Sequence, residues 1–454
     1  MAKDTARTYW RIVLVWLLAG CALGLLCALS LIFPDLARIS PVLGYGRLLA
    51  AHRAAMIHGV LFTFIFALSY SILPPLVQLS PSRWVLGKIL LAFGSLVVLF
   101  GLIFILAGKG SGWEYSDFPV ELSFLFWLYL LGTAIDIGYI VINGRVLREH
   151  PATGFLILAA LLPSVAYPFT IPGWWGAGLF APLRIWIGWR TIFFGSFTAA
   201  AIGSGIWILG AQKPSPKLNR GAFIIAALLF TGLAPFSGIV HLLDAPLISG
   251  LKAWGAFSAI VAGTGLIILA ILLIKKIDSN PSNVLLLGGA AGLIIASVQG
   301  MILCVPPIYT AFHYTMNTSG HAHLAFGSIM LIFIAGGILS ASYLSGRKFP
   351  SGGKMLLYAG LFATGMLLIV LFQSAIGFLQ SEVSDKSQEI ASIFGAIRRN
   401  EYGILLGGVL AFFGVVLMTP LFIRALKPDE NSRIAQELHE ESERESSDGG
   451  EERS

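Results

Sequence analysis

Long apolar stretches are the feature that most constrains what this chain can fold into. About 20 predominantly apolar residues in a helix are enough to cross the hydrocarbon core of a bilayer. Stretches of about this length fall at residues 10–33, 48–78, 86–107, 119–142, 152–170, 188–211, 222–247, 253–274, 283–305, 318–341, 354–379 and 402–424. We therefore predict an all-α, polytopic membrane protein with about twelve transmembrane helices in one bundle.

The composition supports this fold class and sets one segment apart. Of the 454 residues, 56% are hydrophobic and 12% are charged, whereas an ordinary soluble domain carries about 25% charged residues. Residues 427–454 are rich in Glu and Ser and contain almost no large apolar side chain after Leu438. We predict a membrane domain over residues 1–426 and an acidic, disordered or weakly helical tail over residues 427–454.

The distribution of Lys and Arg predicts the orientation in the membrane. Cytoplasmic loops carry an excess of these residues. Here the excess lies in the loops that would share a side with the N-terminus, among them those with Arg83, Arg145, Lys217, Lys275 and Arg347. Both termini are therefore expected in the cytoplasm, and the membrane is expected to be a bacterial or archaeal cytoplasmic membrane. The net charge of +7 follows from this loop bias, without a basic cluster that would indicate nucleic-acid binding.

The tripeptide His321-Ala322-His323 stands near the start of one apolar stretch, in a chain with eight histidines. Residues two apart on a helix point about 200° away from each other. The two imidazoles therefore cannot share one metal ion, but they can serve two cofactors on opposite faces. A helix standing between two metal centres is the first hypothesis for this motif.

Two further histidines fall at the same predicted depth. His52 lies about one turn inside the second helix and His241 lies near the end of the seventh. Together with the tripeptide they occupy one layer about 5–10 Å below the outer surface. Ionisable groups inside a membrane are costly and usually functional, which favours cofactor ligation. A structural role, in which an imidazole bonds across helices, stays open, most of all for the deeper His58.

Two segments resemble a known family. The sequence HYTMNTSGHAHLAFG at residues 313–327 is similar to the tenth helix of catalytic subunit I in the heme-copper oxidase superfamily, particularly in the cbb-type oxidases and nitric oxide reductases. The sequence GRLLAAH at residues 46–52, followed by Ser69-Tyr70, resembles the low-spin heme segment of that family. The resemblance implies ligands on helices two, seven and ten, and two hemes, expected to be of b type, within the membrane domain.

Carried over to this chain, the resemblance implies roles for individual residues. His52 and His323 would be the axial ligands of a low-spin heme. His321 would be the proximal ligand of a high-spin heme whose other side is open to a diatomic gas. The residues with supporting roles would be His313, beside the hemes, and Arg47 and Arg53, as partners of heme propionates.

The third metal of the family is where this chain departs from the pattern. The family holds copper or non-heme iron with one histidine of helix six and a neighbouring pair on helix seven. Here Arg190 occupies the first position and the pair is reduced to His241. A guanidinium has no lone pair to offer a metal, so we expect no tightly held copper or non-heme iron. The predicted site is a high-spin heme facing Arg190, His241 and Asp244, with Asp244, a propionate or an anionic ligand of the iron as candidate partners of Arg190.

Three functional hypotheses follow from these observations. The first is a divergent respiratory subunit I that passes electrons from a low-spin to a high-spin heme, where oxygen or nitric oxide is bound or reduced. The second is a diheme membrane cytochrome that conducts electrons within a larger respiratory complex without a functional third metal. The third is a heme-based gas sensor or assembly factor, with the acidic tail as its docking arm.

Partner subunits are expected because the chain carries no electron-entry domain that we can recognise. It contains no CxxCH motif for covalent heme attachment. A membrane-anchored cytochrome c or copper protein is the expected electron donor. The aromatic outer loop around Trp174 and Trp175 is either its docking surface or an ordinary membrane anchor.

Overall fold

Helices make up all the regular structure of the described chain. The computed structural model describes residues 2–73, 84–143, 151–174, 178, 180–212, 220–277, 281–346, 352–383 and 390–427. Within these ranges eleven helices are long and apolar enough to cross a membrane, and the number reaches twelve if one bent pair counts as a single span. The predicted all-α polytopic bundle is therefore confirmed. The predicted acidic tail lies outside the described residues beyond Lys427.

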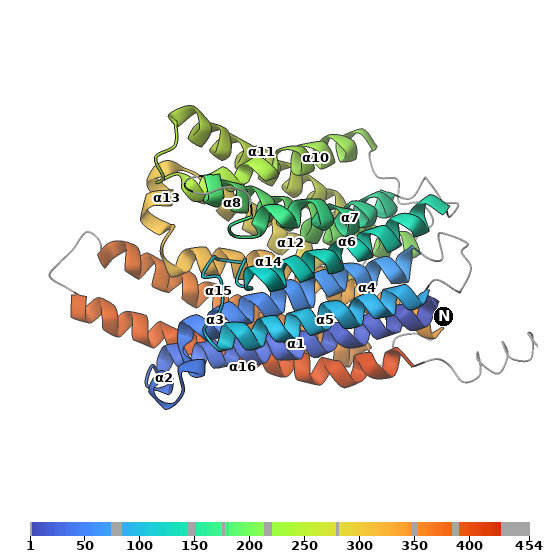
Figure 1. Cartoon of the computed structure of the whole chain (residues 1–454), viewed down its shortest axis with the longest axis horizontal. Helices are drawn as coiled ribbons and strands as arrows, with labels where there is room; N and C mark the ends of the chain where they lie inside the picture. Colours follow the sequence, from blue (N-terminus) through green and yellow to red (C-terminus); the bar gives the residue numbers. More distant parts are fainter. Residues whose placement is uncertain are drawn as a thin grey trace, which may run out of the picture.

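The spans follow one another along the chain (Figure 1). Three of them are composite: α3 (Tyr45–Ala54), the π-helix η2 (Ala55–Leu61) and α4 (Phe62–Ile72); α8 (Phe180–Ile192), the π-helix η5 (Phe193–Thr198) and α9 (Ala199–Gln212); and α10 (Arg220–Leu233) with the 3-10 helix η6 (Pro235–Leu242). The others are α1 (Ala2–Ile32), α5 (Trp84–Leu106), α6 (Val120–Asn143), α7 (Pro151–Thr170), α11 (Ser249–Ile274), α12 (Pro281–Leu303), α14 (Met316–Ser345), α15 (Gly352–Val383) and α16 (Ile390–Ala425). The short helices on the connections are α2 (Leu36–Ile39), η1 (Pro41–Leu43) and α13 (Pro306–Phe312).

The seventh predicted span is broken rather than continuous. The sequence predicts one helix over residues 222–247, but α10 ends at Leu233 and η6 begins at Pro235, with a bend of 46° between them. Proline explains the break, because it has no N–H to donate and its ring clashes with the preceding helical turn. His241 therefore lies on a 3-10 segment rather than on a straight transmembrane helix.

Three other helices begin well before the predicted residue. The first span begins at Ala2 instead of residue 10, the sixth at Phe180 instead of 188, and the last at Ile390 instead of 402. Each extension contains an arginine whose guanidinium donates to a backbone carbonyl: Arg7 to Leu344, Arg184 to Phe169 and Arg398 to Ile32. Hydropathy marks the part of a helix that lies in hydrocarbon, and a helix continues past that part wherever its polar groups find partners.

The most buried spans are those that carry the predicted site residues. In the apolar part of each span, 94% of residues are buried for residues 45–72, 83% for 180–210 and 72% for 316–345, against 33% for α16. The first two each contain a π-helical segment, η2 or η5. Such segments are rare and often occur at functional sites. The bundle is therefore built around the helices that carry His52, Arg190 and the His-Ala-His motif.

The two ends of the bundle differ in content. Figure 1 shows the N-terminus and the end of α16 at one end, and α2 and α13 at the opposite end. The helices that carry His52 and His323 both start from the end with α2 and α13, since α3 follows α2 and α14 follows α13 along the chain. The histidine layer therefore lies near that end. Which compartment each end faces stays a prediction.

Helices α15 and α16 pack with their backbones almost touching. A Cβ added at Gly365 would lie 2.5 Å from the carbonyl oxygen of Gly407 and 2.5 Å from the amide nitrogen of Ala411. A Cβ added at Gly414 would lie 2.7 Å from the amide nitrogen of Phe362. Small residues allow this close approach, which transmembrane helices use because lipid offers no hydrophobic driving force for their association.

We predict that Gly365→Ala lowers the melting temperature of the purified protein in detergent. The new methyl group forces the two backbones apart, and overpacking of this kind typically costs about 1–3 kcal/mol. Gly360→Ala on the same helix is the matched control, because a Cβ there meets nothing within 4 Å. Equal melting temperatures for the two variants, measured by size-exclusion chromatography after heating, would contradict the close α15–α16 contact.

Candidate functional site

Two imidazoles face each other between the α3 and α14 helices. The ring centroids of His52 and His323 lie 6.2 Å apart and their planes differ by 13°. Each ring uses Nδ1 in a hydrogen bond of 2.9 Å, His52 to the carbonyl oxygen of Gly20 and His323 to that of Ser319. A carbonyl accepts a hydrogen bond, so Nδ1 carries the proton in both rings and each Nε2 keeps its lone pair. The two rings would therefore offer a metal held between them one nitrogen ligand each.

A glycine on α1 makes room for the His52 ring. A Cβ added at Gly24 would lie 2.9 Å from both Cε1 and Nδ1 of His52. Contacts this short do not occur for real side chains. Gly20, one turn earlier on α1, supplies the carbonyl that accepts from the same ring. Helix α1 therefore both orients His52 and leaves space for it.

A cavity of about 420 Å³ lies against this histidine pair. This size falls within the range of about 300–1,000 Å³ that is usual for ligand sites. Apolar side chains such as Met330, Met366 and Phe326 form much of its wall. The polar and aromatic residues that line it include His52, His323, Arg53, Glu114, Tyr115, Trp186, His241 and His313.

His321 lies on another side of α14 and is not among the residues that line this cavity. A Cβ added at Gly300 of α12 would lie 3.1 Å from its Cε1 atom, so its ring packs against that helix. Its Nδ1 is buried and has no hydrogen-bond partner in the described structure. The structure thus separates the two histidines of the motif, as the two-residue spacing predicts.

Arg190 contacts His241 directly. The Nη2 atom of Arg190 donates to Nε2 of His241 across 2.6 Å. The His241 ring stacks on Trp186, with centroids 3.7 Å apart and planes within 9°. Trp186 stands one turn before Arg190 on α8, so one helix both covers the imidazole and caps its nitrogen. The lone pair that His241 would offer to a metal at Nε2 is engaged by the guanidinium.

His313 and Asp244 belong to a small group at the end of the bundle that carries α13. Asp244 accepts hydrogen bonds from the hydroxyls of Tyr309, at 3.3 Å, and Tyr314. The His313 ring stacks on Tyr309 at 4.2 Å and lies 5.8 Å from the His241 ring. Burial lowers the pKa of His313, although Asp244 opposes that shift. Asp244 was one candidate partner of Arg190. In the structure Asp244 bonds to these two tyrosines instead, and Arg190 bonds to His241.

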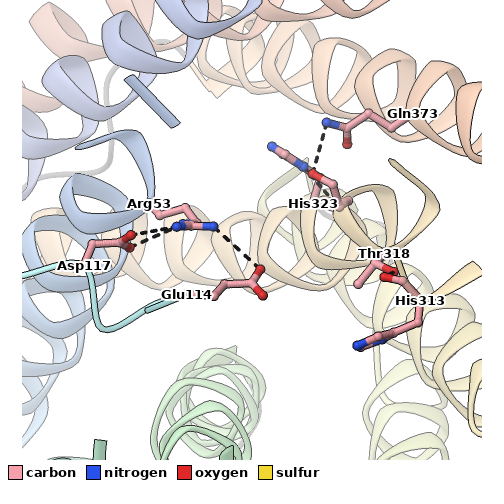
Figure 2. A network of polar contacts seen from close by, with 8 residues as sticks. Arg53, Glu114, Asp117, His313, Thr318, His323 and Gln373 are labelled. Atoms are coloured by element: carbon pink, nitrogen blue, oxygen red, sulfur yellow. Dashed lines mark hydrogen bonds and ion pairs between the residues drawn. The ribbon is translucent and has the colours of Figure 1, made fainter. Parts of the chain in front are cut away.

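The two arginines predicted to meet propionates have protein partners. Arg53 bonds to Asp117 through Nη2 at 2.6 Å and pairs with Glu114 at 3.7 Å, as Figure 2 shows. Arg47 donates to the backbone carbonyl of Leu106 at 3.1 Å. The Asp117 side chain is buried, and burial raises its pKa to about 6 in spite of the nearby Arg53. Through these contacts the end of α5 and the connection between α5 and α6 are bonded to α3, the helix that carries His52.

No group of three or more His, Cys, Asp or Glu side chains comes together in a metal-binding arrangement in the part of the chain that the structure describes. The His52–His323 pair has a different geometry, in which two ligands leave four positions around a metal for the nitrogens of a macrocycle. Its donor set therefore fits a heme.

A sequence model of the family described as Cytochrome C and Quinol oxidase polypeptide I matches residues 4–419. The chain belongs to this family. Members are heme-containing oxidoreductases of respiratory electron transport in membranes, and this chain is accordingly a heme-copper-oxidase-like subunit I. A search of curated proteins gives no match.

Several side chains of this oxidase-family site escaped the sequence analysis. Asp117 and Glu114 were not expected as partners of Arg53, and Trp186 was not expected to stack on His241. Two acidic residues in a connection next to a buried arginine were the available signal for the first contact. For the second there was none, because a tryptophan near a helix start is usual in any membrane protein. Of the predicted docking loop, Trp174 packs on Trp127 and Phe124, while Trp175 lies outside the described residues.

We predict a pH dependence that originates in Asp117. Because its pKa is about 6 in the folded protein and about 4 in an unfolded chain, the folded state binds the proton more tightly. The contribution of Asp117 to stability is therefore lost as the pH rises between these values. The melting temperature of Asp117→Asn in detergent should vary less over this range than that of the natural protein. Asp35→Asn, which removes an exposed pair with Arg38, is the control that should keep the original slope; an unchanged slope in Asp117→Asn would refute the assignment.

Proposed function

We propose that this subunit passes electrons from a low-spin heme, held by His52 and His323, to a high-spin heme on His321, where oxygen or nitric oxide is bound or reduced. The observation that carries the proposal is the facing pair of imidazoles at 6.2 Å, each with Nδ1 bonded to a backbone carbonyl. Such bonds orient a ligating histidine and raise the basicity of its other nitrogen. A heme with both axial positions filled transfers electrons, whereas one with an open position binds a gas.

His321 supports the second half of the proposal. It stands two residues from His323 on a different face of α14, so one helix joins the two centres. A buried imidazole nitrogen without a partner is unfavourable unless the ring interacts with something else, and Nδ1 of His321 is such a nitrogen. The proposed electron path is therefore short and runs across α14.

The third metal of the family does not fit the residues of this chain. Arg190 carries a permanent positive charge and caps His241, the one histidine of the seventh span. We assign no step of the function to copper or non-heme iron. The residues facing the proposed second heme would instead hold ligands by hydrogen bonding and charge.

The same observation favours a second candidate function, an electron conduit within a larger respiratory complex. Without the third metal, the center that binds the gas lacks one redox group that could donate electrons to it, so complete reduction of the gas is less favoured. Steady consumption of oxygen or nitric oxide by the purified complex, supplied with electrons, separates the two candidates. The third hypothesis, a gas sensor or assembly factor, rests on the acidic tail. The electron donor that we propose is a membrane-anchored cytochrome c or copper protein.

We predict two hemes per chain and no copper or non-heme iron after purification. His52→Ala and His323→Ala should each remove the low-spin signal from the electron paramagnetic resonance spectrum and retain the high-spin signal. His321→Ala should remove the high-spin signal and retain the low-spin signal. His58→Gln is the control, because His58 bonds to Tyr167 and should leave both signals unchanged. One copper or extra iron per chain would overturn the assignment of the third site.

We also predict that Gly24→Ala damages the low-spin center without touching a ligand. Its methyl group would stand 2.9 Å from the His52 ring and would displace it. The low-spin signal should weaken or change its g values while the high-spin signal stays. Gly46→Ala on the helix that carries His52 is the control, since a Cβ there meets nothing within 4 Å. Identical spectra for both variants would argue that His52 is not a heme ligand in the position described.

A further inference from the structure

We propose that a chain of oxidisable aromatic side chains supplies single electrons to the heme center in the cavity when the electron donor does not. The members of this relay, in order from the cavity wall, are Trp186, Tyr115, Trp189 and Tyr167. His58 accepts a proton at the far end. The inference rests on the proposed function, because the electron acceptor is the low-spin heme held by His52 and His323. It adds a source of electrons that needs neither a third metal nor a partner subunit.

The relay begins in the wall of the cavity. Tyr115 and Trp186 both line it, together with the facing imidazole pair, and the centroids of their rings lie 5.9 Å apart. The Tyr115 ring lies 6.1 Å from Trp189, which in turn lies 6.0 Å from Tyr167. These separations are those of neighbouring aromatic rings in contact. Tryptophan and tyrosine are the aromatic side chains most easily oxidised by one electron, so every step of the chain joins two oxidisable groups.

The backbone of Tyr115 shows that its ring is held in place. Its φ angle is +63°, and it is the one non-glycine residue with a positive φ in the described part of the chain. A bulky residue rarely adopts this conformation, which persists where the surroundings impose it and often marks functional sites. The guanidinium of Arg53 lies 5.8 Å from the Tyr115 ring and pairs with the neighbouring Glu114. The connection between α5 and α6 thus fixes the ring between the cavity wall and Trp189.

A proton acceptor stands at the far end of the relay. The hydroxyl oxygen of Tyr167 lies 3.0 Å from Nε2 of His58. In the tautomer with the proton on Nδ1, Tyr167 donates this hydrogen bond. His58 is 1% exposed, and its ring is enclosed by Phe118 at 4.3 Å and Phe126 at 4.9 Å. An imidazole among apolar rings, away from water, is costly in a membrane and usually marks function.

The polar groups of the relay distinguish it from ordinary aromatic packing. Phenylalanine would fill the same volume without an N–H or O–H group that needs a partner inside a membrane. Instead the indole N–H of Trp189 donates to the hydroxyl of Ser116 at 2.8 Å, and Tyr167 bonds to His58. Each of these side chains therefore keeps a polar group that packing alone does not use.

The reaction begins with hydrogen peroxide, the product of incomplete oxygen reduction. Its O–O bond breaks, it takes two electrons from the hemes and two protons from water, and two water molecules form. The oxidised low-spin heme then regains one electron, which passes along the relay from Tyr167. The O–H bond of Tyr167 breaks, its proton bonds to Nε2 of His58, and a neutral tyrosyl radical and an imidazolium remain. Tyr167 is oxidised by one electron, and the heme is reduced by one.

The test is to mix the oxidised, heme-loaded complex with hydrogen peroxide in the absence of an electron donor and to freeze it rapidly for electron paramagnetic resonance. We expect the signal of an organic radical. In protein that carries ring-deuterated tyrosine the signal should narrow, because the unpaired electron of a tyrosyl radical couples to the ring hydrogens. Peptide mapping of the treated natural protein by mass spectrometry should find the oxidised tyrosine at Tyr167.

Variants assign the signal to the relay. Tyr167→Phe should lose the tyrosyl signal, and Trp189→Phe, which interrupts the chain, should lose most of it. His58→Gln, which removes the base, should lower its yield. Tyr129→Phe is the matched control, because Tyr129 is also buried and packs on Phe126; its tyrosyl signal should equal that of the natural protein. A tyrosyl signal of full size in Tyr167→Phe would overturn the proposal, and so would one in Trp189→Phe.

Two outcomes keep the relay separate from the proposed function. If the natural protein contains no heme, the proposed function fails, and the relay fails with it because it has no electron acceptor. If both hemes are present and peroxide changes their absorption, but no tyrosyl signal appears and Tyr167 is unmodified, only the relay is refuted. This second measurement uses the natural protein, so it decides the question even if a variant does not fold.

Discussion

A polar side chain in the center of this bundle is costly without a partner, because a membrane offers no water to replace one. That constraint explains the contacts of the most buried residues. Tyr70 donates to Asp136 at 2.5 Å, Trp10 donates to Ser71, and Trp189 donates to Ser116. The first two bonds each join two helices, and the third joins α8 to the connection between α5 and α6. The polar pairs therefore help to specify which helices are neighbours, while the apolar surface alone would accept many arrangements.

The same constraint distinguishes the two centers of the site. At His52 and His323 each Nδ1 donates to a backbone carbonyl, so each Nε2 keeps its lone pair. At Arg190 and His321 one buried nitrogen of each side chain has no partner in the described structure. The first arrangement is that of a preformed ligand pair. The second supports the proposal that a cofactor supplies the missing partner of His321 on this side of α14.

If Arg190 replaces a metal ligand, as we propose, the consequences extend beyond one residue. A histidine at that position would offer a lone pair, whereas the guanidinium donates to His241 and so removes a second lone pair from use. The stacking of Trp186 on His241 then stabilises the capped ring.

The apolar stretches and the two-residue spacing in His321-Ala322-His323 determined much of this protein. They were sufficient for the all-helical bundle and for the opposite faces of the two histidines, because hydrophobic length and helical periodicity are local properties. The break at Pro235 was also written in the sequence, but a transmembrane helix tolerates some prolines, as α7 does with Pro163 and Pro168, so it could not be predicted with the same force. Only the tertiary structure decided that Arg53 meets Asp117, that Gly24 makes room for His52 and that Arg190 caps His241. Each of these contacts joins separate helices or connections, and their meeting depends on how the whole bundle packs.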